Sequence, residues 1–226
     1  MTNRHELERG NREEISQDRP EVSDDAIDFT GMYATHDAFR RDLDRLTAAA
    51  QAGKGSAPEV RAGWTTFKAQ LLVHHSVEDA HLWPALRRAV ADRPRDLALT
   101  EDMVAEHAQL DPLLAAVDEA LAGEAVDLGA RSRELSAALN HHLTHEEERA
   151  LPLIQSVLTR ADWRRFTSQM ARRQGVRGAA VYVPWTLDGS PTVAQRRFVA
   201  ALPAPLRMIN RVLWQPRYRK RNLWNF

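Results

Sequence analysis

The 226-residue sequence contains no cysteine, which excludes disulfides, thiolate zinc sites and cysteine-ligated iron–sulfur clusters. The side chains left as metal ligands are those of His, Asp and Glu, a donor set that suits iron or manganese, with zinc also possible. Long apolar runs are absent as well. No stretch reaches the roughly 18 apolar residues of a membrane span, and the N-terminal segment lacks the apolar core of a signal peptide. We therefore expect a cytoplasmic protein.

The net charge is zero, yet the two signs of charge are separated along the chain. Residues 1–159 hold 17 Lys+Arg against 29 Asp+Glu, whereas residues 160–226 hold 14 against 2. The length suits one domain with an appendage, because a domain typically takes about 100–200 residues. We predict a flexible polar arm at 1–22, a helical domain at 23–160 and a basic C-terminal extension at 161–226 that contains Trp, Arg and Pro.

Apolar residues recur at intervals of three and four in four segments of the predicted domain, which indicates amphipathic helices. Ser23 is a plausible N-cap of the first of them. Four such helices with short connections predict an all-α fold, an antiparallel up-down-up-down four-helix bundle with a partly helical extension. Pro84, Pro112 and Pro152 fall inside helical patterns and should kink or restart a helix. Asp111 and Pro112 together match an N-cap and first helical position.

One sequence motif occurs twice. The segment HHSVEDAHLWP, which ends at Pro84, returns in degenerate form as HLTHEEERALP, which ends at Pro152. Both copies have a His ten residues before the proline and a Glu six residues before it. On a helix this i, i+4 spacing places imidazole and carboxylate on one face, where both can reach a single metal ion. The two pairs are His74 with Glu78 and His142 with Glu146.

His36 and His107 lie alone on the apolar stripes of the other two helices. A lone His on such a stripe is more often a hydrogen-bonded core residue than a ligand. Buried together, however, these imidazoles and the two carboxylates would cost several kcal/mol per charge unless they were paired or metal-bound. No matching set of inward Lys or Arg is present. We therefore predict a dinuclear metal site with His36, His74, Glu78, His107, His142 and Glu146 as ligands.

The order H, HxxxE, H, HxxxE across about residues 23–160 resembles the hemerythrin-like (HHE cation-binding) family. The resemblance implies two iron ions joined by an oxo or hydroxo bridge, with one nitrogen from each His and with Glu78 and Glu146 bridging; manganese or zinc remains possible. Respiratory hemerythrins carry a fifth His where this chain has Asp111, and their last His-to-carboxylate spacing is one residue longer. The pattern is closer to the four-His/two-Glu branch that includes di-iron cluster-repair proteins.

With two bridging glutamates, each iron would have two imidazoles and two carboxylate oxygens, so both metals would stay open to small molecules. We expect a non-haem di-iron protein that reacts with peroxide, O2 or NO in oxidative or nitrosative stress or in iron-centre repair. The alternative is a non-enzymatic iron- or oxygen-binding sensor or storage module that signals through its C-terminal tail. An oxidant-reactive protein would consume its substrate in excess over iron, whereas a sensor or storage module would not.

Some positions allow more than one interpretation. His75 with Asp79, and His141 with His145, form further i, i+4 pairs that are rotated off the apolar stripes. We interpret them as residues that face solvent or contact the ligands, and whether they or Asp111 substitute as ligands stays open.

The basic extension allows several partners. We favour packing on the acidic body of the same chain or on a second subunit as a homodimer, because the two opposite charges match. Basic residues mixed with tryptophans also occur at membrane surfaces, and nucleic acid is the least favoured partner.

Overall fold

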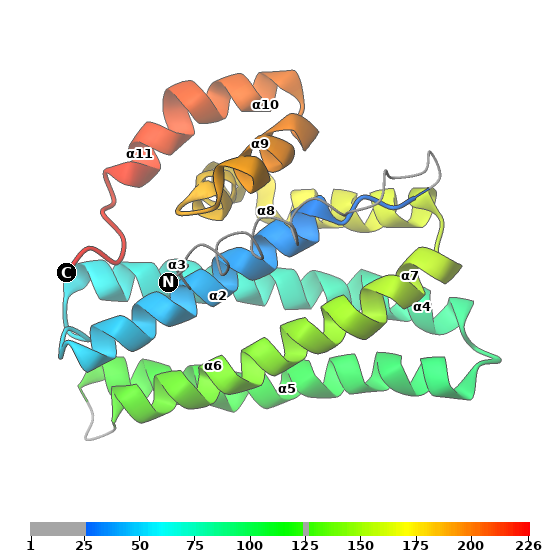
Figure 1. Cartoon of the computed structure of the whole chain (residues 1–226), viewed down its shortest axis with the longest axis horizontal. Helices are drawn as coiled ribbons and strands as arrows, with labels where there is room; N and C mark the ends of the chain where they lie inside the picture. Colours follow the sequence, from blue (N-terminus) through cyan, green and yellow to red (C-terminus); the bar gives the residue numbers. More distant parts are fainter. Residues whose placement is uncertain (1–25, 124–126) are drawn as a thin grey trace, which may run out of the picture.

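The computed structural model describes residues 26–123 and 127–226, which form helices and short connections without a strand, so the predicted all-α class is confirmed. The predicted arm at 1–22 and the predicted N-cap Ser23 lie outside the described residues. Four long helices lie lengthwise together in Figure 1. They are α2 (Thr30–Gln51), α3 (Pro58–Val77), α5 (Pro94–Ala122) and α6 (Leu128–His145).

The contacts between these helices close a ring: α2 packs on α3 and α6, and α5 packs on α3 and α6. The local sequence sets where several of them begin and end. Pro58 and Pro94 occupy the first helical position of α3 and α5, where a missing N–H costs nothing. Gly123 ends α5 in the left-handed conformation, with φ 92°. α2 begins at Thr30, later than the sequence predicted, because residues 26–29 are not helical.

Both copies of the repeated motif contain a wide π-helical turn. η1 (Glu78–Leu82) leads into α4 (Trp83–Ala89), and η2 (Glu146–Ala150) leads into α7 (Leu151–Val157). In each copy the N–H just before the proline bonds to the glutamate carbonyl five residues back. The wider turn removes the clash that a proline makes with the carbonyl four residues before it. The predicted disturbance at these two prolines is therefore a π-turn that starts at a predicted ligand.

The predicted restart of a helix at Pro112 is wrong. Pro112 lies inside α5, which continues without interruption from Pro94 to Ala122, and Asp111 does not cap a new helix.

The predicted ligands lie between two separate apolar cores. Along each of the four long stretches, the buried apolar side chains belong to one core before the ligand level and to the other core after it. On α5, for example, Met103 belongs to one core and Leu110 to the other, with His107 between them. The sequence thus folds into a polar layer that apolar side chains close off on both sides.

The C-terminal extension packs on the bundle. It comprises α8 (Arg160–Leu187), α9 (Thr192–Ala201), α10 (Ala204–Ile209), η3 (Asn210–Trp214) and α11 (Gln215–Arg219). α8 contacts both α2 and α3, and α9 contacts α2. In Figure 1, α9 to α11 lie on the side of α2 and α3, away from α5. Packing of the basic segment on its own acidic body, one of the interpretations of the sequence, is therefore observed.

One bend and two contacts place this extension on the bundle. α8 bends at Gly175, whose φ of 60° and ψ of −179° are outside the helical region and essentially restricted to glycine. Asp42 of α2, 1 % exposed, accepts hydrogen bonds from the Trp185 indole at 2.8 Å and the Arg41 side chain at 2.9 Å. At the C-terminal end, Trp224 lies so close to Gly63 that any side chain there would overlap its ring.

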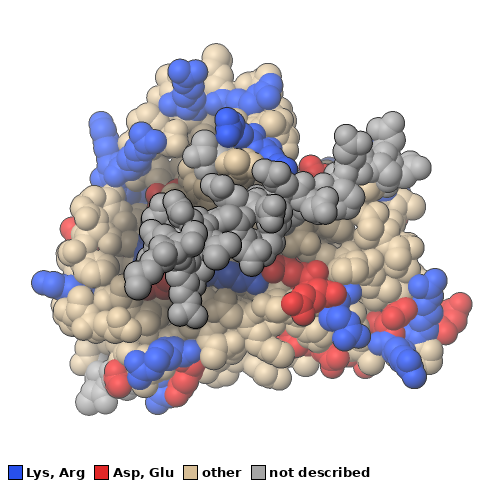
Figure 2. Space-filling view, in the orientation of Figure 1, with Lys and Arg blue, Asp and Glu red and all other residues tan. Residues whose placement is uncertain are grey.

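The outer surface of the extension is basic. In Figure 2, the charged side chains on the part of the surface that α9 to α11 occupy in Figure 1 are mainly Lys and Arg, whereas both signs of charge mix over the bundle. None of the described helices combines the length and apolarity needed to cross a membrane.

Candidate metal centre

All six residues predicted as metal ligands are buried and lie at one level of the bundle. His36, Glu78, His142 and Glu146 are fully buried, and His74 and His107 are 3 % and 5 % exposed. They come from four different helical stretches, so their proximity is a product of the tertiary fold rather than of sequence spacing alone. The polar layer between the two apolar cores is made largely by these side chains.

One group consists of His36, His74 and Glu146, whose ligand atoms all lie within 4.8 Å of one another. The Nε2 atoms of His36 and His74 are 3.3 Å apart, and His36 Nε2 is 3.2 Å from Glu146 Oε2. Two imidazole nitrogens and a carboxylate oxygen directed at one point form a donor set that fits iron, manganese or zinc.

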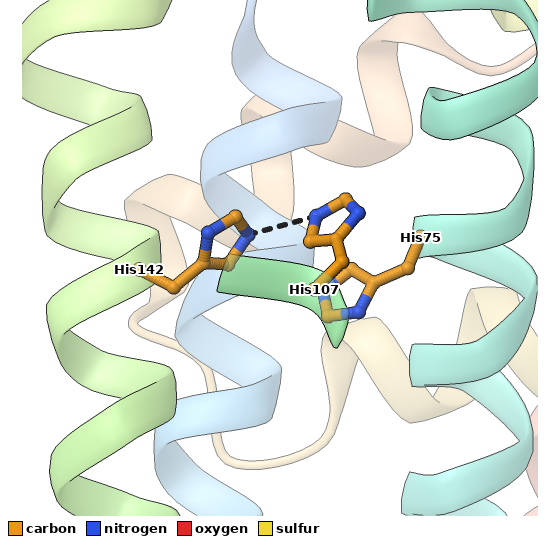
Figure 3. A group of neighbouring side chains, drawn as sticks. All are labelled: His75, His107 and His142. Atoms are coloured by element: carbon orange, nitrogen blue, oxygen red, sulfur yellow. Dashed lines mark hydrogen bonds between the residues drawn. The ribbon is translucent and has the colours of Figure 1, made fainter. Parts of the chain in front are cut away.

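A second group consists of His75, His107 and His142, which Figure 3 shows converging from α3, α5 and α6. The Nε2 atoms of His107 and His142 are 3.1 Å apart. The His75 ring is stacked on the His107 ring, with centroids 3.8 Å apart and planes 12° from parallel. This group is made entirely of imidazoles and is buried.

Glu78 lies between the two groups. Its Oε1 is 3.1 Å from Nε2 of His74 in the first group, and its Oε2 is 3.7 Å from Nε2 of His107 in the second. The two oxygens of one carboxylate thus face imidazoles of different groups, which is the arrangement that a carboxylate needs to bridge two metal ions.

Two carboxylates inside the layer, those of Glu78 and Glu146, have oxygens without a hydrogen-bond partner among the described residues. Both oxygens of Glu78, both oxygens of Glu146 and Nε2 of His75 are buried without a hydrogen-bond partner among the described residues. An unsatisfied buried polar group is costly, and an unpaired buried carboxylate is more so. Metal ions would satisfy all five atoms together, so the residues present fit a metal centre on the chemistry of the site itself.

Three carboxylates hold the outer edges of the imidazoles. Nδ1 of His36 lies 2.8 Å from Glu147 Oε1, Nδ1 of His107 lies 2.8 Å from Asp79 Oδ1, and Nδ1 of His142 lies 2.9 Å from Glu106 Oε2. A carboxylate on the outer nitrogen fixes the tautomer that presents Nε2 to the interior, and metal-bound imidazoles usually have such a partner.

Burial and neighbouring charges shift the pKa values of this layer. Burial alone would lower the pKa of His36, but the nearby carboxylates of Glu146 and Glu147 raise it to about 9. Burial, followed by repulsion from Glu146 and Asp79, raises the pKa of Glu78 well above its usual value. His74 has a pKa held well below the usual value by burial and by neighbouring imidazoles. In the metal-free protein, protons therefore occupy part of the ligand set and metal ions must displace them.

His75 contacts a predicted ligand, which is one of the two interpretations of the sequence, and whether it is itself a ligand stays a prediction. It is 8 % exposed, its ring stacks on His107, and its Nε2 lies inside the second group without a hydrogen-bond partner among the described residues. Burial and nearby imidazoles hold its pKa well below the usual value, so it is neutral and can donate a lone pair. The adjacent histidines His74 and His75 were the sequence signal for this position, because two successive residues of a helix can both be buried when the helix packs between two others.

The other residues with an ambiguous interpretation, and the nearby His81, belong to neither of the two groups. His81 and Asp111 are exposed. The His141 side chain is 74 % exposed, and His145 bonds through Nδ1 to Glu106 at 2.8 Å. Asp79, expected to pair with His75, instead contacts His107.

Helices that enclose buried His and Glu groups able to hold a metal ion are the pattern of a helical cation-binding domain. The hemerythrin HHE cation binding domain matches residues 29–154, more than half of the chain, and the chain belongs to that family. Comparison with curated proteins and with solved structures found no match. The match ends before α8, so the extension lies outside the part that the family describes.

Proposed function

We propose that the chain is a non-haem di-iron protein of the four-His/two-Glu branch, built on an antiparallel up-down-up-down bundle. The observation that carries the proposal is the set of four buried carboxylate oxygens of Glu78 and Glu146, which lie among imidazole nitrogens and have no hydrogen-bond partner in the described part of the chain. The proposed ligands are His36, His74, Glu78, His107, His142 and Glu146.

The proposed activity is reaction with a small oxidant such as peroxide, O2 or NO, in stress protection or iron-centre repair. Two bridged iron ions would supply redox chemistry and open coordination positions for such molecules. The protein residues orient the ligands: Glu147, Asp79 and Glu106 hold the outer imidazole nitrogens. The apolar cores on both sides keep bulk water away from the layer, which strengthens the electrostatic interactions within it.

His75 favours a second candidate, a non-enzymatic iron- or oxygen-binding sensor or storage module. A fifth imidazole would give the second group three nitrogens against two in the first. One metal would then have fewer open positions than the other, and such asymmetry suits reversible binding of one ligand rather than turnover. The extension, which contacts α2 and α3 beside the first group, would be the part that communicates with a partner.

Iron content and turnover test the two candidates. The full chain is reconstituted anaerobically with ferrous iron and then given a large excess of peroxide. Consumption of many equivalents per iron supports the oxidant-reactive protein, and a spectral change that saturates at one equivalent and reverses supports the sensor. A chain that binds no iron contradicts both.

His75→Ala shows which coordination applies, with the exposed His81→Ala as the matched control. If His75 is a ligand, its removal weakens the second metal and leaves the first, whereas His81→Ala retains both. Equal metal content in the two variants assigns His75 to packing and favours the six-ligand site. His74→Ala must lower iron content in either case.

A further inference from the structure

A cavity of about 330 Å³ lies between the extension and the bundle. One side belongs to α2 and α3 and the other to α8 and the segment from α9 to α10. Its size and mainly apolar walls are typical of small-molecule sites, which are concave, mostly apolar and carry few polar groups. The apolar walls include Met32, Trp163, Phe166, Met170, Val183 and Leu206.

Two hydrogen-bonded pairs supply polar groups to this cavity, beside His74, Asp28 and Thr167. Thr35 Oγ1 and the Tyr182 hydroxyl are 2.7 Å apart, and Gln174 Nε2 donates to Gln70 Oε1 at 2.6 Å. Each pair joins the bundle to α8. The second bond uses the carbonyl oxygen of Gln70, which is 6 % exposed, so the amide N–H groups of Gln70 remain as donors.

His74 connects this cavity with the metal centre. Its Nε2 lies 3.3 Å from His36 Nε2 and 3.1 Å from Glu78 Oε1, so Nδ1 is the ring nitrogen left for a molecule in the cavity. Among the six proposed ligands, the other three imidazoles have a carboxylate on Nδ1. No carboxylate of the described residues takes this role for His74. A bound oxygen atom would supply the missing acceptor.

We propose that the cavity binds a small amphiphile, with one hydrogen-bond-accepting oxygen at the His74 and Gln70 end and an apolar body against Met32, Phe166 and Met170. Most of the lining lies at residues 163–206, beyond the matched family domain, so the site is specific to the extension. The lining carries no Lys or Arg, and its one carboxylate is Asp28, which disfavours a strongly anionic ligand. Binding requires only the folded chain and no metal.

The primary alcohols 1-hexanol, 1-octanol and 1-decanol serve as probes in calorimetric titrations of the metal-free full chain. We expect one site per chain and about fourfold tighter binding per added methylene, the factor that corresponds to about 0.8 kcal/mol per buried CH2. The heat capacity change should be negative, as for burial of apolar surface. Heats that do not saturate, or an affinity independent of chain length, contradict the proposal.

Filling the cavity tests its location. Ala179→Phe places a ring inside it and should weaken 1-octanol binding at least tenfold, whereas Ala161→Phe, at an exposed position of the same helix outside the cavity, should not. Ala171→Phe, at an exposed position on the rim, serves as a second filling variant if Ala179→Phe does not fold. Equal binding by filled and control variants that melt like the wild type overturns the proposal.

Removing the donor tests the head-group assignment. Gln70→Leu has a similar volume without the amide and should weaken 1-octanol about 2- to 12-fold, the range of one net hydrogen bond. The factor per methylene should stay the same, because the walls around the apolar body are unchanged. An unchanged affinity for 1-octanol contradicts the assigned orientation.

Discussion

Loss of the Asp42 carboxylate is expected to loosen the extension from the bundle. Asp42 is 1 % exposed and accepts from the Trp185 indole at 2.8 Å, from Arg41 at 2.9 Å and from Arg45 at 3.3 Å. In Asp42→Ala the Trp185 N–H is left buried and unsatisfied, which costs about 1–3 kcal/mol. The two arginines lose an ion-pair partner as well.

The arginines reduce the total cost because they keep other acceptors. Arg41 donates to the carbonyl of Trp185 at 2.9 Å, and Arg45 donates to Asp188 at 2.7 Å. Their side chains are 15 % and 29 % exposed, so water screens part of the loss. We therefore expect Asp42→Ala to cost about 2–4 kcal/mol, near or below the lower end of the range for breaking a fully buried pair. At about 0.5 kcal/mol/K of unfolding entropy for this length, Tm should fall by about 4–8 °C.

The assay is thermal unfolding by circular dichroism, together with hydrogen exchange of residues 160–226. Asp42→Asn keeps an oxygen for Trp185 and should lose about half as much stability. Asp44→Ala, exposed on the same helix, should change stability by no more than about 0.5 kcal/mol. If Asp42→Ala melts like Asp44→Ala and the extension exchanges as slowly as in the wild type, the Asp42 carboxylate does not hold the extension on the bundle.

Three further predictions concern the metal site and the bend in the extension. Glu78→Gln should reduce the metal content from about two to at most one per chain. It should not lower the Tm of the metal-free protein, because it removes a buried carboxyl that has no hydrogen bond. Elemental analysis and thermal melting measure the two effects, and a variant that retains both metals contradicts the prediction. The His36 pKa of about 9 means that its proton competes with metal below that pH. Affinity in chelator competition should therefore rise about tenfold per pH unit towards pH 9 and then level off, whereas a pH-independent affinity would exclude His36 as a ligand. Gly175→Ala forces an alanine to φ 60° and ψ −179°, which should lower the free energy of unfolding by about 1–3 kcal/mol and the Tm by about 2–6 °C. The control Gly31→Ala, in open space within α2, should leave the stability almost unchanged. Equal melting temperatures of the two variants would show that the bend is not strained.

Helical periodicity was sufficient to predict which faces point inward. It predicted that His36, His74, His107 and His142 share apolar stripes, and the structure brings all four to one level. The prediction worked because i, i+3 and i, i+4 spacing depends on local geometry alone. The proposal that these residues bind iron rests on the family and on the unpaired carboxylates, which periodicity does not reveal.

The remaining features depend on packing between elements that are distant in sequence. His75 is rotated about 100° from His74, yet it is buried because α3 has neighbours on more than one side. Pro112 looked like a break, but the helix continues through it. The bend at Gly175 and the cavity beside His74 arise only once α8 packs on α2 and α3. That the basic extension forms a homodimer or attaches to a membrane surface stays a prediction.

The most direct test of the central claim is the metal content of the purified full chain, measured with its near-ultraviolet and visible spectrum after anaerobic reconstitution with iron and exposure to air. A di-iron centre predicts about two irons per chain and absorption from oxo-bridged ferric iron that changes when peroxide is added. It also predicts loss of that absorption in Glu78→Gln. One zinc per chain, or no bound metal and no such absorption after reconstitution, would contradict it.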